Sequence, residues 1–183
     1  MLDGASPSHR QRHMSAFEGV LEAMGEGNMT SSTLKLQRMR IGPQDCDRLV
    51  AALRGRSDIT DVDLTGNAIG DEGAASLGRL LSSDVDCPPL KSLSLGGALG
   101  GNGVGPDGVR ALVAGLRNSH TLASLNLTRN ATGDVGCSHL AGLLSSSPCL
   151  SDLNLRGNGV AEAGADALAA AIAEGAALRA LNL

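Results

Sequence analysis

The chain has 183 residues, 42% of them apolar, and a formal net charge of -4 at pH 7. This composition is typical of one soluble globular domain, and no apolar run approaches the roughly 18 residues that a membrane-spanning helix needs. Neither half has the dense basic patch of a nucleic-acid-binding protein, and the N-terminus lacks a secretory signal. We therefore expect a cytoplasmic protein with no membrane and no nucleic-acid partner.

The first element that the sequence predicts is an amphipathic helix over residues 8–25. Its apolar residues recur at helical spacing and share one face: Phe17, Val20, Leu21 and Met24. We expect this helix to cap the structure that follows, although binding to a partner or to a membrane surface is an alternative function for such a face. The expected division is an N-terminal segment with the capping helix, 1–30, and a main body, 31–183.

The main body is built from repeats. The stretches "ITDVDLTGNAIGDEGAASLGRLL" from Ile59, "LASLNLTRNATGDVGCSHLAGLL" from Leu122 and "LSDLNLRGNGVAEAGADALAAAI" from Leu150 align without a gap. An earlier copy begins at Leu34, and another begins at Leu90. The sequence thus contains five repeats of about 28 residues, followed from residue 178 by the first six residues of a sixth.

Each repeat predicts a short strand followed by a helix. In the second repeat, Val62 and Leu64 alternate with Asp61 and Asp63, so the apolar pair faces a core and the acidic pair faces outward. Apolar residues then recur at helical spacing. A proline or an acidic residue suits the first turn of each helix: Pro43, Asp71, Pro106, Asp134 and Glu162. Strand and helix can therefore cover each other's apolar side.

Two further positions recur in the repeats. Glycine occurs near the start of four helices, where we expect a helix to approach a strand closely: Gly73, Gly108, Gly136 and Gly164. Asparagine follows the strand in four repeats, where its amide can satisfy backbone groups in the turn: Asn67, Asn102, Asn130 and Asn158. Met39 takes that position in the first repeat, which predicts a less regular turn there.

The pattern L-x-x-L-x-L-x-x-N, followed by a "GDEGAxxL" helix, resembles leucine-rich repeats of the ribonuclease-inhibitor type. That family also includes the ligand-sensing repeats of NOD-like receptors and the GTPase-activating protein for Ran. The resemblance covers residues 31–183. It implies an α/β leucine-rich repeat solenoid, curved, with parallel strands on the concave side and helices on the convex side.

The stretch "LSLGGALGGNGVGPDGVRAL", residues 93–112, looks at first like a phosphate-binding loop. However, no lysine or serine follows Gly105, and the nearest dinucleotide pattern is Gly101, Gly103 and Gly105, which is G-x-G-x-G. The flanking residues fit the third repeat once four inserted residues are set aside. A surface insertion of this size costs little in loop-closure entropy, so we expect no cofactor.

The cysteines and histidines do not predict a metal site or a disulfide. The four thiols form neither a C-x-x-C pair nor a cluster with histidine: Cys46, Cys87, Cys137 and Cys149. Cys46 and Cys137 share a repeat position with alanine and valine, which indicates small core residues. His9 and His13 are spaced for one helix face, but two ligands flanked by arginines make a poor metal site.

Alternation along the strands also predicts which side chains a partner would meet. The candidates on the concave face and at the strand ends are Lys35, Gln37, Arg38, Asp61, Asp63, Asn126, Arg129, Asp152, Asn154 and Arg156. Tight interfaces usually rest on Trp, Tyr and Arg, and this chain has no Trp or Tyr, so modest affinity is expected. Lys35 and Asp63 could instead satisfy each other as neighbours on adjacent strands.

The functional prediction is a non-catalytic protein–protein interaction module or scaffold, whose partner is another protein. No nucleophile with a base and no carboxylate pair in a pocket is recognisable. Two alternatives remain: a Ran-type GTPase-activating protein, with Arg38 and Arg40 as the residues to test, and a structural subunit of a larger assembly. The leucines of the sixth repeat, from Leu178 to Leu183, lack a covering helix, so further repeats or self-association are expected at that end.

Overall fold

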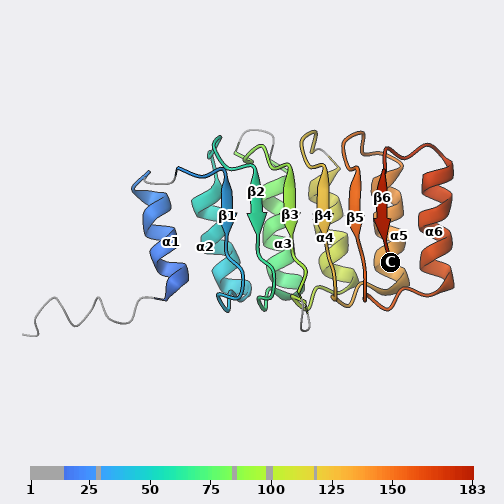
Figure 1. Ribbon diagram of the computed structural model, residues 1–183, viewed down its shortest axis with the longest axis horizontal. Coiled ribbons are helices and arrows are strands. Elements are labelled where there is room, and N and C mark those ends of the chain that lie inside the picture. Colours follow the sequence, from blue (N-terminus) through green and yellow to red (C-terminus); the bar gives the residue numbers. More distant parts are fainter. Residues whose placement is uncertain (1–14, 28–29, 84–85, 98–100, 118) are drawn as a thin grey trace, which may run out of the picture.

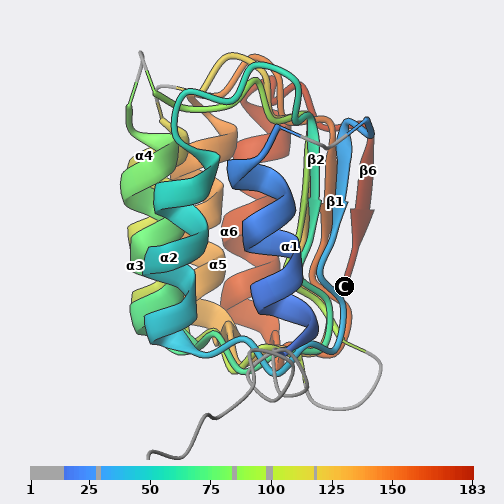
Figure 2. The same ribbon diagram turned by 90° about the vertical axis from the view of Figure 1, so that its left-hand side faces the viewer.

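The computed structural model describes residues 15–27, 30–83, 86–97, 101–117 and 119–183. Strands and helices alternate along these residues and form two layers, with the helices on one face of a single sheet (Figure 2). The helices are α1 (Ala16–Gly25), α2 (Pro43–Leu53), α3 (Gly70–Leu81), α4 (Pro106–Leu116), α5 (Gly133–Leu144) and α6 (Glu162–Ala173). The strands are β1 (Thr33–Lys35), β2 (Asp61–Asp63), β3 (Ser92–Ser94), β4 (Ser124–Asn126), β5 (Asp152–Asn154) and β6 (Ala180–Asn182).

The six strands lie side by side in chain order, β1 to β6, and every pair is parallel (Figure 1). Parallel neighbours need a crossover connection, and the helix of each repeat supplies it. The register places equivalent residues side by side, so Leu34, Val62 and Leu93 are adjacent. The predicted α/β solenoid is confirmed, with the strands on one side of the molecule and the helices on the other.

The core lies between the two layers. The central residue of each of the first five strands is at most 2% exposed, and the leucines of the helices pack against them. The helices begin within one residue of the positions that the sequence indicates, at Pro43, Gly70, Pro106, Gly133 and Glu162. Burying these apolar side chains stabilises the fold by about 25 cal/mol per Å² of apolar surface.

The recurring glycines correct one expectation. They do not mark a close approach of helix to strand; they mark contacts with the neighbouring helix and with the residue that precedes their own helix. A Cβ on Gly73 would lie 2.9 Å from Cys46 Sγ of α2, and one on Gly164 would lie 3.1 Å from Cys137 Cβ of α5. At Gly73, Gly108 and Gly164 a Cβ would lie within 3.1 Å of an atom of the preceding helix, and at Gly136 it would meet Thr132 of the same repeat.

The turn asparagines have the role that the sequence predicts, and each also joins two repeats. Asn67 Oδ1 accepts hydrogen bonds from the N–H groups of Met39 and Ile41, at 2.9 and 3.1 Å. Its Nδ2 donates to the carbonyls of Leu36 and Leu64. Asn130 and Asn158 make the same kind of bridge further along the stack. The buried turns are therefore tied to one another by side chains as well as by the sheet.

Helix α1 packs on the N-terminal end of the stack, beside α2. Phe17 and Met24 are buried there, and Ser15 Oγ caps the helix by accepting from the N–H of Glu18. Arg48 of α2 makes two hydrogen bonds of 2.6 Å with the carboxylate of Glu18. The part of the predicted helix before residue 15, with His9 and His13, lies outside the described residues.

At the other end of the stack, apolar residues are more exposed than their counterparts in earlier repeats. Leu183 is 50% exposed and Ile172 is 39% exposed, whereas Leu155, the counterpart of Leu183, is fully buried. Further repeats or self-association at this end stay a prediction. In the described part of the chain, no helix is long and apolar enough to cross a membrane.

Candidate functional site

The outward side chains of the sheet form three rows, which we call the strand face. The first row is Thr33, Asp61, Ser92, Ser124, Asp152 and Ala180, and the second is Lys35, Asp63, Ser94, Asn126, Asn154 and Asn182. Backbone hydrogen bonds extend the ladder beyond the strands to a third row: Gln37, Thr65, Gly96, Thr128 and Arg156. The predicted alternation thus places all these residues on one side of the molecule.

The N-terminal part of the strand face is held by short polar contacts. Asp63 accepts one hydrogen bond from Gln37 Nε2 at 2.6 Å and another from the N–H of Thr65 at 3.0 Å. Lys35 is the neighbour of Asp63 in the register, as expected, but the hydrogen-bonding partner of Asp63 on β1 is Gln37. The idea of a self-satisfied Lys35–Asp63 pair is therefore replaced by an amide–carboxylate pair one row further along.

The centre of the strand face is organised by Asn126. Its Oδ1 accepts from the N–H and the hydroxyl of Thr128, and its Nδ2 donates to Ser94 Oγ at 3.1 Å. The side chain lies against Gly96, where an added Cβ would come within 2.9 Å of Asn126 Oδ1. Glycine in the third repeat thus makes room for the carboxamide of the fourth.

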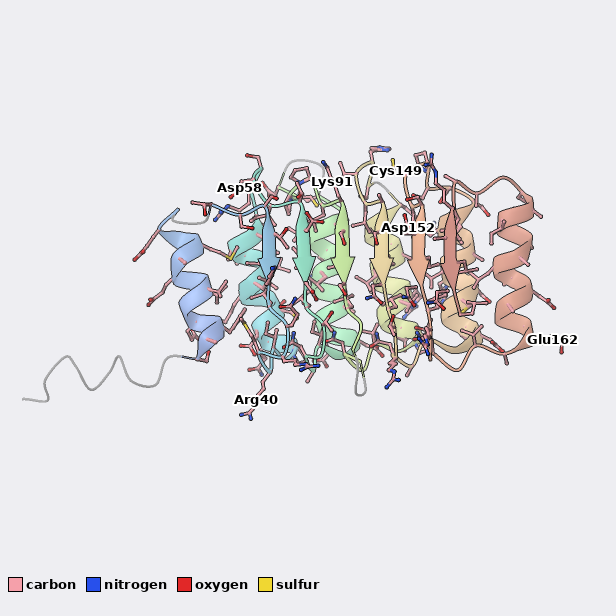
Figure 3. The ribbon with its side chains drawn as sticks, in the orientation of Figure 1. Arg40, Asp58, Lys91, Cys149, Asp152 and Glu162 are labelled. Atoms are coloured by element: carbon pink, nitrogen blue, oxygen red, sulfur yellow. The ribbon has the colours of Figure 1, made fainter. Side chains whose placement is uncertain are left out.

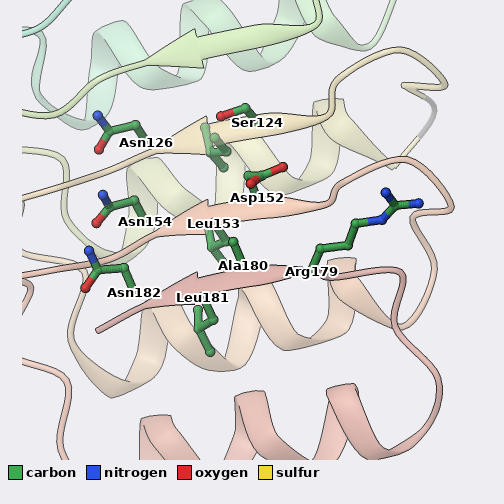
Figure 4. A pocket seen from close by; sticks show the side chains of 10 residues that line it. Ser124, Asn126, Asp152, Leu153, Asn154, Arg179, Ala180, Leu181 and Asn182 are labelled. Atoms are coloured by element: carbon green, nitrogen blue, oxygen red, sulfur yellow. The ribbon is translucent and has the colours of Figure 1, made fainter.

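A shallow depression of about 550 Å³ lies over β4, β5 and β6. Figure 4 shows the carboxamides of Asn126, Asn154 and Asn182 in one line, with Arg179 extending from the opposite end of β6. Ala180 has a small side chain at a position where the preceding strands carry hydroxyl or carboxylate groups. On β6, the small side chain of Ala180 therefore lies between the hydrogen-bonding side chains of Arg179 and Asn182.

Several groups around the depression keep hydrogen-bonding capacity. Asn154 Oδ1 accepts from the N–H of Arg156 at 3.1 Å, and within the described residues its Nδ2 has no partner. Asp152 accepts from the hydroxyl of Ser151 at 2.5 Å. The exposed guanidinium of Arg179 adds donors. These groups can bind a polar surface or main-chain groups of a second molecule.

The sequence-based list misses Arg179 and Asn182, because it stops at the fifth repeat. The same alternation, applied to the strand of the sixth repeat, would have placed Asn182 on the strand face. The remaining candidates, Arg38, Arg129 and Arg156, lie in or next to the turns that follow β1, β4 and β5. The structure therefore gathers the ten predicted residues on one side but does not enclose them in a cleft.

The thiols of Cys46 and Cys137 belong to the core, whereas Cys87 and Cys149 are half-buried. Burial raises the pKa of Cys46 to about 12, and the neighbouring carboxylates of Asp45 and Asp47 add to that increase. Burial likewise raises the pKa of Cys137. A raised pKa disfavours the thiolate, which is the nucleophilic and metal-binding form. No group of three or more metal-binding side chains occurs within the described ranges.

Comparison with known proteins gives a consistent result for the fold. Residues 57–78, 118–141 and 146–169 match the family model described as Leucine Rich repeat. The solved structure titled "Leiomodin-1 Actin-Binding Site 2 (ABS2)" superposes with a TM-score of 0.63 at 17% identity, covering 88% of this chain and 92% of its own. The tropomodulin C-terminal domain of Caenorhabditis elegans superposes with a TM-score of 0.61 at 16% identity, covering 87% and 92%. No curated protein sequence matches the chain.

Proposed function

We propose that this chain, which is a leucine-rich repeat protein, is a non-catalytic module that binds another protein through its strand face. The observation that carries the proposal is the strand face itself. It presents three aligned rows of amide, hydroxyl and charged groups, repeated about every 4.8 Å from strand to strand, around an open depression of about 550 Å³. An open surface of this kind suits a protein better than a small substrate.

The contact residues that we propose are the sequence-based candidates together with Arg179, which precedes β6, and Asn182 of β6. They are Lys35, Gln37, Arg38, Asp61, Asp63, Asn126, Arg129, Asp152, Asn154, Arg156, Arg179 and Asn182. Without Trp or Tyr, the arginines are the residues best suited to anchor a partner. We also propose a cytoplasmic location, because free thiols such as Cys46 and Cys137 are typical of a reducing compartment.

The proposal is tested by crosslinking and affinity capture from the cells that make the protein. The test variant is Asn154→Lys, which changes the centre of the depression, and the control is Ala114→Lys, which adds the same charge on the exposed side of α4. We expect the Asn154 variant to lose the captured protein and the Ala114 variant to retain it. Equal capture by both variants would show that the strand face is not the binding surface.

Two partners can be tested directly. Leiomodin-1 carries a segment named as an actin-binding site, so cosedimentation with filamentous actin is a direct first assay. If a small GTPase is captured instead, its GTP hydrolysis should be measured with the parent protein and with the Arg38→Ala and Arg40→Ala variants. Faster hydrolysis that depends on either arginine would favour the GTPase-activating alternative. Unchanged hydrolysis would favour the non-catalytic module.

A further inference from the structure

Helices α4 and α5 border a groove on the side of the molecule that faces away from the sheet. They are neighbours in the helix layer (Figure 1), and a hollow of about 460 Å³ lies between them. We call this hollow the helix groove; its lining includes Arg110, Ala114, Arg117, Ser138, His139 and Gly142. Because the strand face is on the other side of the sheet (Figure 2), the two surfaces can bind different molecules.

The middle of the helix groove is open because both of its walls carry a small residue there. Ala114 and Gly142 occupy the same position in successive repeats, and a Cβ on Gly142 would have no heavy atom within 4 Å. At the same position of α3 stands Arg79, whose guanidinium lies 3.2 Å from a carboxylate oxygen of Asp47 in α2. An ion pair thus bridges α2 and α3, whereas α4 and α5 leave room for atoms of another molecule.

Both ends of the helix groove carry an arginine. Arg110 and Arg117 are two turns apart on α4, which is about 10.5 Å, and His139 of α5 lines the opposite wall. Arg110 also pairs with Asp107, one turn earlier on α4, at 3.0 Å. Within the described part of the chain, the residues that line the hollow include no carboxylate.

The charges differ elsewhere in the helix layer. The smaller hollow between α2 and α3, of about 250 Å³, is lined by Asp47 and Glu72 together with Arg79. Helix α6 carries exposed Glu162 and Asp166 and has no lysine or arginine; Figure 3 shows Glu162 at the start of α6, at the end of the stack. In the described part of the helix layer, a basic lining and an open centre therefore coincide between α4 and α5.

An exposed apolar side chain extends the helix groove along α5. Val135 is 60% exposed, more than any other large hydrophobic residue in the described ranges. It lies one turn before Ser138 and two turns before Gly142, on the same outward side of α5. A molecule bound along the groove would cover this valine, so burial of apolar surface would add to the electrostatic attraction.

We propose that the helix groove binds an acidic helix of another protein, an activity beyond binding at the strand face. The groove follows the axes of two neighbouring helices, and Ala114 and Gly142 let a third helix place an apolar side chain at its centre. Acidic residues seven positions apart on that helix are separated by the same two turns as Arg110 and Arg117, so both can accept charge-assisted hydrogen bonds. The acidic residues of α6 disfavour binding of the same helix on the adjoining surface.

The test measures binding of a fluorescein-labelled, alanine-rich helical peptide by fluorescence anisotropy, at about 50 mM salt, where electrostatic contacts are weakly screened. The peptide carries glutamate at i and i+7 and leucine at i+3 and i+4, which places all four on one helix face. The variant R110Q/R117Q removes two charges from the groove, and Gly142→Leu fills its centre without changing the charge. The matched controls are R54Q/R79Q, on α2 and α3, and Gly19→Leu, on the exposed side of α1.

We expect each groove variant to weaken binding of the peptide about tenfold, while each control stays within about twofold of the parent protein. Thermal melting checks that each variant is folded. The Asn154→Lys variant should bind the peptide as the parent does, because Asn154 lies on the other side of the sheet.

Four results would overturn the inference: no binding of the peptide, unchanged binding by Gly142→Leu, equal loss in R110Q/R117Q and R54Q/R79Q, or equal binding of a peptide with the same charge and proline on either side of the leucines, which cannot form the helix. Tighter binding of a short oligothymidylate would overturn the choice of an acidic protein helix. The proposed function is judged separately, by capture of a protein that Asn154→Lys loses and Gly142→Leu retains.

Discussion

Asn102 and Asn158 occupy equivalent turns, but their side-chain oxygens have different surroundings. Asn158 Oδ1 accepts from both the N–H and the hydroxyl of Thr132, at 3.2 and 2.5 Å. Asn102 Oδ1 is buried and has no hydrogen-bond partner among the described residues. The residue equivalent to Thr132 is Ile69, which has no hydroxyl to offer. The hydroxyl of Thr132 thus gives Asn158 Oδ1 a second donor, whereas Asn67 Oδ1 and Asn130 Oδ1 each accept from two backbone N–H groups.

This difference gives a prediction at Thr132. The substitution Thr132→Val keeps the shape of the side chain but removes the hydroxyl, leaving Asn158 Oδ1 with the longer N–H contact alone. Because Thr132 is fully buried and water cannot replace the hydroxyl, the free energy of unfolding should fall by about 0.5–1.5 kcal/mol, as for the loss of one hydrogen bond. Urea denaturation followed by circular dichroism measures it.

The matched control is Thr128→Val on the strand face. The Thr128 hydroxyl makes the same bond, at 2.5 Å to Asn126 Oδ1, but both residues are only half-buried. Water can replace the lost donor there, so the cost should stay below about 0.5 kcal/mol. Equal losses in the two variants would contradict the view that burial of the acceptor makes the difference.

Between elements, the closest packing joins α3 and α4. A Cβ on Gly115 would lie within 2.8 Å of the carbonyl carbon and 3.0 Å of the Cα of Gly78, so the two helices meet backbone to backbone. Gly142, in α5, has no heavy atom within 4 Å of the same point. The two glycines lie in the same kind of helix in the same layer. Only at Gly115 does a neighbouring helix leave no room for a side chain.

The substitution Gly115→Ala should therefore destabilise the fold by about 1–3 kcal/mol, because the helices must separate to admit the methyl group. Gly142→Ala should be neutral or stabilise by up to about 1 kcal/mol, since alanine is the better helix former. Thermal melting of the two variants against the parent protein tests both. A stabilised Gly115 variant would show that α3 and α4 can separate without loss.

Helix α1 is held on the stack by the ion pair between Glu18 and Arg48 and by a hydrogen bond from Arg56, which is itself ion-paired with Asp58. Arg48 holds the pKa of Glu18 below its usual value of 4.5, and hydrogen bonds from Arg56 lower the pKa of Asp58 to about 2. Arg56 also donates to the carbonyl of Met24, at 2.9 Å, near the end of α1. Both carboxyl groups have lower pKa values in the folded protein. Their contribution is therefore present above about pH 4.5 and is lost as the pH falls toward 2.

We expect α1 to loosen on acidification before the inner repeats unfold. Hydrogen-exchange protection of the α1 amides should fall as the pH drops from about 4.5 toward 2, while α4 stays protected. The substitution Arg48→Gln should lower α1 protection already at neutral pH. Arg79→Gln, which breaks an exposed ion pair with Asp47 between α2 and α3, is the control and should leave α1 unchanged. Simultaneous loss of protection in α1 and α4 would contradict this order.

Across the whole molecule, each repeat contacts only its neighbours, so the position of a residue in the stack decides how deeply it is buried. Leu125 and Leu181 occupy the same position in β4 and β6, two strands apart in the register. Leu125 is 1% exposed, with repeats on both sides, whereas Leu181 is only half-buried. Two leucines at the same repeat position should therefore contribute differently to the stability of the fold.

The corresponding prediction compares two truncations. Leu125→Ala should lower the free energy of unfolding by about 2–5 kcal/mol, as truncation of a buried leucine does, because it removes contacts and leaves a cavity. Leu181→Ala should cost less than half of that, since solvent can fill the space. Chemical denaturation of both variants under the same conditions checks the ratio. Equal costs would mean that another molecule covers β6.

The strand face shows what could and could not be predicted at the level of the site. Alternation along each strand assigned Asp61, Asp63 and Asn154 to the outward side, and the sheet confirms this. The pairing of Asp63 with Gln37 depends on the lengths and rotamers of side chains on two strands, which alternation does not specify. The depression depends on Ala180, Asn182 and Arg179 meeting β4 and β5, a contact between three repeats.

The sequence by itself determined the repeat, the order of strand and helix, and the residues that face the core, because these follow from local periodicity and from the residue types that turns and helix starts require. Only the tertiary structure decided which glycines touch a neighbouring helix, which carbonyls each asparagine bridges, and that Arg38 and Arg129 adopt a left-handed backbone beside Gly66 and Gly157. These features are relations between repeats about 28 residues apart. The periodicity of a single repeat contains no information about the distance between its side chains and those of the next, and packing alone sets that distance.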